Sequence, residues 1–150
     1  MMSDKNYCRI ASMFGVGNSP VMQGTAACVV ALPFFILIHN MVLFAIITIA
    51  ITAVAFIVSG PAEKSYGTKD PKFIVIDDFA GQLITYLFIP FSWKMVLIGF
   101  FLFRMFDMLK IFPANVAEKY PGAAGVVGDD VIAGVYANIV LQIAIRLAGV

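Results

Sequence analysis

The run MVLFAIITIAITAVAFIV, residues 41–58, carries no charged residue. Its 18 residues approach the roughly 20 that an α-helix needs to cross a bilayer at about 1.5 Å per residue. Four shorter apolar stretches, none with the alternation typical of a strand, cover residues 26–38, 79–91, 95–103 and 131–145. The pattern predicts an all-α protein of mostly short helices.

Composition indicates a membrane protein. Hydrophobic residues make up 61% of the chain and charged residues 13%, with a mean hydropathy of +0.95, whereas soluble domains have about 45–50% and about 25%. A net charge of +1 offers no electrostatic field for nucleic acid. We expect residues 1–150 to form a single domain, a compact helical bundle that passes the membrane several times through short helical hairpins.

Two tight breaks predict the tips of those hairpins, one at His39-Asn40 and one at Ser92-Trp93-Lys94. If both are hairpins, one side of the membrane receives eight of the ten basic residues: Lys5, Arg9, Lys64, Lys69, Lys72, Arg104, Lys110 and Lys119. The positive-inside bias makes that side cytoplasmic. Two alternatives stay open, a single tilted span over residues 79–103 kinked at Pro90, and a soluble helical bundle.

The acidic residues fall between the apolar stretches. Five aspartates lie at the ends of these stretches, where a membrane surface would bring them together: Asp77, Asp78, Asp107, Asp129 and Asp130. Paired aspartates precede two of the apolar stretches, and helix capping is the simplest explanation of either pair alone. A glycine follows each pair one turn later, however, and such oxygen-rich clusters suit Mg²⁺.

Other polar residues are candidates for binding phosphate. Arg104, Asp107 and Lys110 recur at three-residue intervals, so a helix that ends at Pro113 would place them on one face. They form either a structural ion-pair ladder or a site for phosphate and metal. Further upstream, residues 15–20 and Gly24-Thr25 form a glycine-rich turn before a helix, which favours either a simple cap or an anion site.

Several phosphatase chemistries are excluded by the sequence. The chain has one histidine, His39, so a catalytic histidine pair is impossible. Neither Cys8 nor Cys28 is followed six positions later by arginine, which excludes a cysteine phosphatase loop, and there is no Asp-x-Asp motif. We expect both cysteines to be free thiols in a reducing compartment.

Taken in order, these clusters resemble the phosphatidylglycerophosphatase A family. The matching positions are Gly15, Gly17, Ser19, Pro20, Gly24 and Thr25, then Asp77 and Gly81, the segment 103–113, and the segment 125–134. The chain departs from the family pattern at Asp78, where glutamate is usual, at Gln23, where proline is usual, and at residues 26–28. The shorter Asp78 side chain changes the reach of that carboxylate.

The resemblance implies an enzyme of the bacterial inner membrane, with its active site facing the cytoplasm. It implies Mg²⁺-dependent hydrolysis of the terminal phosphomonoester of phosphatidylglycerophosphate, a phospholipid substrate held in the bilayer. The implied catalytic residues are Asp77, Asp107 and Asp130. The implied metal ligands are Asp77, Asp78, Asp107, Asp129 and Asp130, and the implied phosphate-binding residues are Ser19, Thr25, Arg104 and Lys110.

Two other functions remain open from the residues alone. Carboxylates in membrane proteins commonly mark ion pathways, so a small transporter or cation-pathway protein is the main alternative. A non-catalytic membrane scaffold, whose charges only fix its topology, is the other.

Overall fold

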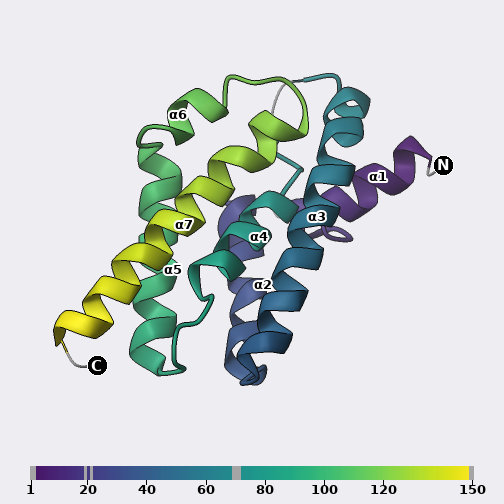
Figure 1. Ribbon diagram of the computed structural model, residues 1–150. Helices are drawn as coiled ribbons and strands as arrows, with labels where there is room; N and C mark the ends of the chain where they lie inside the picture. The colour runs from purple at the N-terminus through teal and green to yellow at the C-terminus, as the bar shows by residue number, and fades with distance from the viewer. Residues whose placement is uncertain (1–2, 19, 21, 69–71, 149–150) are drawn as a thin grey trace.

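The computed structural model describes residues 3–18, 20, 22–68 and 72–148. The regular elements among these residues are helices, and there is no strand among them. Figure 1 shows the arrangement. The α-helices are α1 (Asp4–Ala11), α2 (Gln23–Leu37), α3 (Met41–Tyr66), α4 (Ile76–Thr85), α5 (Trp93–Leu109), α6 (Ala114–Ala117) and α7 (Ala123–Ala148), with a 3-10 turn, η1 (Val16–Asn18). The predicted all-α fold is confirmed.

The first predicted hairpin is present. Helix α2 ends at Leu37, and α3 begins at Met41 after a connection of three residues. Asn40 caps α3, because its side-chain oxygen accepts hydrogen bonds from the backbone N–H groups of Val42 (3.0 Å) and Leu43 (3.1 Å). The side chain of Asn40 therefore stabilises the turn at His39-Asn40.

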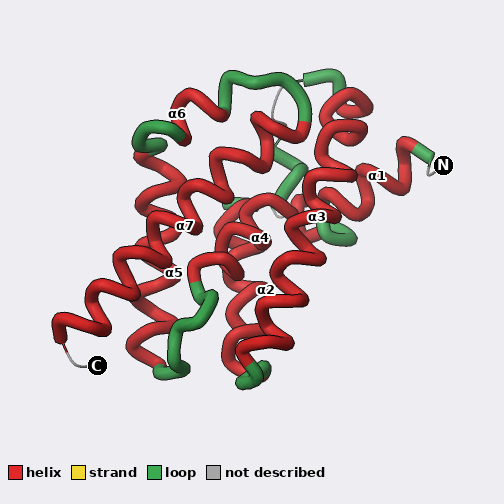
Figure 2. The backbone as a smooth tube through the Cα atoms, in the orientation of Figure 1, coloured by secondary structure: helices red, strands yellow, loops and turns green. Residues whose placement is uncertain are grey.

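The second hairpin differs from the prediction in its position. Helix α4 ends at Thr85, so the apolar stretch 79–91 is only half helical, and residues 86–92 connect it to α5 (Figure 2). The side chain of Ser92 caps α5 by accepting from the N–H of Met95 at 3.1 Å. Trp93 and Lys94 thus belong to the first turn of α5 rather than to the tip, and a continuous span over residues 79–103 is wrong.

Side chains of α7 satisfy the backbone at this break. Asn138 Nδ2 donates to the carbonyl oxygens of Thr85 (3.0 Å) and Leu87 (2.7 Å), and Gln142 Nε2 lies 3.4 Å from the carbonyl oxygens of Leu87 and Phe88. A helix end in apolar surroundings needs such donors, because carbonyl groups without water or partners are costly to bury. The side-chain amides of α7 therefore allow α4 to end in the middle of the apolar stretch 79–91.

Helix α4 is the centre of the bundle. In Figure 1 it lies between α3 and α7, and nine of its ten residues are buried. It approaches α7 most closely at two glycines: a Cβ atom on Gly134 would lie 2.5 Å from the carbonyl oxygen of Gly81. Only residues without side chains permit this crossing.

The outer faces of the long helices are apolar and exposed. Helices α3 and α7 are the described helices long and apolar enough to cross a membrane, and only 22% of the most apolar segment of each is buried inside the protein. Exposed leucine, isoleucine, phenylalanine and methionine side chains continue along α5. A surface of this size and composition is expected against lipid rather than water, which favours the membrane interpretation over a soluble bundle.

We predict that Asn138→Leu lowers the free energy of unfolding by about 1–3 kcal/mol, because the carbonyl groups of Thr85 and Leu87 lose their donor. Thermal unfolding of the purified protein in detergent measures the effect. Gln142→Leu is the matched control, and it should cost less because its contacts are longer. Equal stability of Asn138→Leu and the unchanged protein would contradict this account of the break.

Candidate active site

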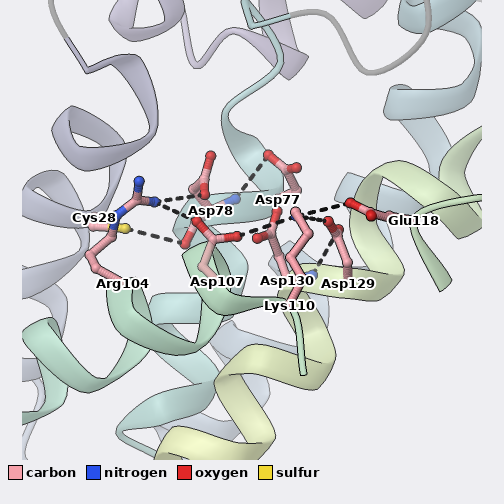
Figure 3. A network of polar contacts seen from close by, with 9 residues as sticks. All are labelled: Cys28, Asp77, Asp78, Arg104, Asp107, Lys110, Glu118, Asp129 and Asp130. Atoms are coloured by element: carbon pink, nitrogen blue, oxygen red, sulfur yellow. Dashed lines mark hydrogen bonds and ion pairs between the residues drawn. The ribbon is translucent and has the colours of Figure 1, made fainter. Parts of the chain in front are cut away.

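All five predicted aspartates line one pocket of about 220 Å³ at the polar end of the bundle. They come from α4, α5 and α7, and Figure 3 shows them side by side. The other lining residues are Gln23, Gly24, Lys72, Ile74, Arg104 and Lys110. Segments far apart in the sequence are thus brought together as the hairpin topology requires.

Asp77 and Asp78 lie in the first turn of α4, as predicted. Neither is the N-cap, which is Val75, so capping does not account for the pair. The buried Asp77 accepts from the N–H of Asp78 at 2.9 Å, and Asp78 faces the start of α2. A Cβ atom on Gly24 would lie 2.8 Å from Oδ2 of Asp78, so glycine is needed for this approach.

Asp129 and Asp130 lie inside α7, which corrects the prediction that they open a helix. Helix α7 begins at Ala123, and Asp129 accepts from the N–H of Asp130 at 2.9 Å. The first turn of α7 packs closely on the preceding connection, because a side chain on Gly125 would strike the carbonyl group of Tyr120. Both carboxylates are 3% exposed, as buried as apolar core residues.

Helix α5 contributes the predicted face of Arg104, Asp107 and Lys110. Arg104 donates to Asp107 at 2.8 Å and to Asp78 at 3.2 Å, which joins α5 to α4. The helix ends at Leu109 and not at Pro113, because Lys110 adopts a left-handed backbone conformation with φ of 47°. From this position Lys110 donates to Asp129 and lies 4.0 Å from Asp107 and 3.5 Å from Glu118.

The charge balance of the pocket is negative. Five carboxylates and three cationic side chains line it. Burial, together with the nearby carboxylates of Asp77 and Asp107, raises the pKa of Asp78 well above its usual range, although Arg104 opposes the shift. Burial alone would lower the pKa of Lys110, but its hydrogen bond to Asp129 and the charges of the nearby aspartates together outweigh this effect and raise the pKa. The site therefore favours additional positive charge.

The carboxylates form two groups that could hold a metal ion. Asp77, Asp129 and Asp130 each place one oxygen within 4.8 Å of the others, and so do Asp78, Asp107 and Asp130. Asp130 belongs to both, and its buried Oδ1 accepts no hydrogen bond from the described residues. A buried acceptor of this kind is unfavourable without a donor, a water or a cation, and an all-oxygen donor set suits a hard divalent cation.

The other two residues predicted to bind phosphate are Ser19 and Thr25. Ser19 lies outside the described residues, and Thr25 is not among those that line the pocket, although its hydroxyl is buried without a hydrogen-bond partner in the described part of the chain. Sequence reasoning missed Lys72, Gln23 and Glu118. Lys72 could have been found from its position, five residues before Asp77, whereas nothing in the sequence indicates that Glu118 reaches Lys110.

We predict that Gly134→Ala lowers the rate of the phosphatase reaction that the sequence motifs imply by about tenfold or more, because the new methyl group would push α7 away from Gly81 and shift Asp130 relative to Asp77. The matched control is Gly128→Ala on the same helix, where the nearest atom to a Cβ is 3.7 Å away. Initial rates at equal amounts of folded protein test the difference. Equal rates in the two variants would show that the crossing does not position the carboxylates.

Comparisons with known proteins identify the family of this chain. The phosphatidylglycerophosphatase A family model matches residues 9–145. A Bacteroides thetaiotaomicron protein, provisionally named a phosphatidylinositol-3-phosphatase, is 34% identical over 90% of this chain and 91% of its own. Escherichia coli phosphatidylglycerophosphatase A is 32% identical over 84% of this chain and 76% of its own. The Haemophilus influenzae protein of the same name is 44% identical over 50% of this chain and 47% of its own.

No solved structure matches the chain. The family model nevertheless spans all five aspartates, the two paired cations and both glycines of the α4–α7 crossing. The resemblance read from the motifs is thereby confirmed: the chain belongs to the phosphatidylglycerophosphatase A family and is a phosphoric monoester hydrolase.

Proposed function

We propose that this enzyme hydrolyses the terminal phosphomonoester of phosphatidylglycerophosphate to phosphatidylglycerol and phosphate, as a step of phospholipid biosynthesis that depends on Mg²⁺. The observation that carries the proposal is the meeting of five carboxylates from three helices in one pocket of an apolar protein of this family. Such a pocket would repel a phosphate dianion unless cations neutralised it.

The chain's own residues would divide the work between holding the metal and holding the phosphate. Asp77, Asp129 and Asp130 would form one set of ligands, and Asp78, Asp107 and Asp130 the other. Mg²⁺ bound there would neutralise the phosphoryl oxygens and acidify a bound water. We assign catalytic importance to Asp77, Asp107 and Asp130 because each comes from a different helix.

Arg104 and Lys110 would stabilise the charge of the reacting phosphate. In the structure both are held by carboxylates, Arg104 by Asp78 and Asp107 and Lys110 chiefly by Asp129. When those carboxylates hold a cation, their attraction for the two side chains weakens. The guanidinium and ammonium groups can then donate to phosphoryl oxygens, which arginine does with two parallel hydrogen bonds.

The position of the acids supports hydrolysis over ion transport. Every acidic residue that the structure describes lies in α1, near the ends of α3 to α5, in the connection before α7 or in the first half of α7. A cation pathway would require carboxylates along the apolar half of the bundle as well, and the described residues place none there. The pocket is therefore better suited to a reaction at a membrane surface.

The Bacteroides relative supports a second candidate substrate, phosphatidylinositol 3-phosphate. That lipid also carries a phosphomonoester beyond a phosphodiester, so the same carboxylates could act on it. Purified enzyme presented with either lipid in detergent micelles, and assayed for released phosphate, decides between the two.

We predict that EDTA abolishes phosphate release and that added Mg²⁺ restores it. Asp77→Asn, Asp107→Asn and Asp130→Asn should each lower the rate by about a hundredfold or more, because amides cannot replace ligating carboxylates. Mg²⁺ should also raise the melting temperature of the unchanged enzyme but not that of Asp130→Asn. Alkylation of thiols should leave the rate unchanged.

Asp4→Asn is the control for these variants, since Asp4 is exposed in α1 and does not line the pocket. Full activity in EDTA, or near-normal rates in all three substituted enzymes, would remove the metal-site proposal. Hydrolysis that needs Mg²⁺ but acts on neither lipid would leave the metal site standing and overturn the substrate.

We further propose that the enzyme lies in the bacterial inner membrane with the pocket facing the cytoplasm, since most basic residues share the pocket's side. In a Cys8→Ser background, Lys119→Cys should react with a membrane-impermeant maleimide only in inside-out vesicles. Lys94→Cys should react only in spheroplasts or stay unreactive. Labelling of both positions from the same side would contradict this topology.

A further inference from the structure

Lys72 differs from the other cationic side chains of the pocket because it has no ion-pair partner among the described residues. It lines the pocket and is exposed, and it forms no ion pair with any residue that the structure describes. Arg104 and Lys110 are each held by at least two carboxylates. Lys72 is therefore the described lysine whose ammonium group is available to an incoming anion at this site.

The backbone that carries Lys72 is anchored on its C-terminal side. The ring of Phe73 stacks on Tyr66 at 5.4 Å, and Ile74 and Val75 are buried. The N–H of Val75 donates to the carbonyl oxygen of Ala11 at 2.9 Å, which ties this segment to α1. The segment therefore holds Lys72 beside the pocket.

The pocket also has a direction, from buried to exposed. Asp77, Asp129 and Asp130 are 3–4% exposed and mark its floor, whereas Lys72 is exposed at the mouth. A phosphomonoester that reacts at the buried carboxylates must enter with the rest of its headgroup trailing toward the mouth. The next anionic group of the lipid would then come close to Lys72.

We propose that Lys72 binds the phosphodiester that joins the headgroup to diacylglycerol, and that it makes the enzyme prefer lipids carrying a phosphodiester behind the reacting phosphomonoester. This inference rests on the proposed lipid phosphatase function and deepens it. Lys72 is a specificity residue on this account and does not touch the phosphate that leaves. An ammonium group at an exposed position suits this role, because it attracts a phosphodiester at long range and releases the product readily.

The test compares two lipids in micelles of an uncharged detergent. Phosphatidylglycerophosphate has both the phosphodiester and the phosphomonoester, whereas phosphatidic acid has the phosphomonoester alone. For Lys72→Ala, the ratio of kcat/KM on the first lipid to kcat/KM on the second should fall about three- to tenfold, through KM. Lys72→Arg should restore most of the ratio, and Lys64→Ala, which removes an exposed lysine of α3 outside the pocket, should leave it unchanged.

Each outcome bears on a different claim. An unchanged ratio of kcat/KM in Lys72→Ala would overturn the specificity role. An equal loss of kcat/KM on both lipids would also overturn it, because Lys72 would then act on the reacting phosphate or on the fold. If the unchanged enzyme hydrolyses neither lipid, the proposed function itself fails. Preference of the unchanged enzyme for phosphatidic acid would also contradict the inference.

Discussion

The crossing of α4 over α7 at Gly81 and Gly134 is the contact on which both ends of the molecule depend. Toward the polar end it brings Asp77 of α4 near Asp129 and Asp130 of α7. Toward the apolar end it places Asn138 beneath the carbonyl groups where α4 stops. The packing of α4 on α7 therefore positions the aspartates and provides hydrogen bonds to the carbonyl groups at the end of α4. A side chain at either glycine would disturb both of these contacts.

The second constraint is electrostatic. Burying several carboxylates together is unfavourable unless opposite charges or hydrogen bonds compensate, and the bundle meets this requirement only in part. Arg104 joins Asp78 to Asp107, and Lys110 lies near Asp107, Asp129 and Glu118. An excess of negative charge remains at the buried floor, where Asp130 keeps an unpartnered oxygen. The site thus forms with an excess of negative charge, which is the condition that the proposed metal-dependent reaction would need.

The sequence predicted the elements that depend on local patterns. The apolar run at 41–58 became the long helix α3, the turn at His39-Asn40 formed where its capping residue stands, and the spacing of Arg104, Asp107 and Lys110 put them on one face. The motif resemblance led to the family, and the two tight breaks, interpreted as hairpins, led to the shared side of the five aspartates.

The errors of prediction all arose where tertiary contacts override the local pattern. The apolar stretch 79–91 gives no sign that α4 stops at Thr85, because the donors that permit the stop lie more than fifty residues away on α7. The start of α7 was placed too late because glycines at 125 and 128 usually weaken helices, whereas here Gly125 is needed for close packing. Helix α5 ends just before Lys110, which forms an ion pair with Asp129, and the spacing of residues along the sequence does not predict this contact.

The confinement of the acids to one end of the bundle has a consequence for biogenesis. Insertion of the proposed membrane protein requires the tips near His39 and Ser92, and the end of α7, to pass through hydrocarbon. Of the ionised side chains in the described chain, only Lys94 and Arg146 lie in those far segments. None of the described aspartates would have to be dehydrated during translocation, so in the proposed orientation the anionic centre could assemble from the side on which the chain is synthesised.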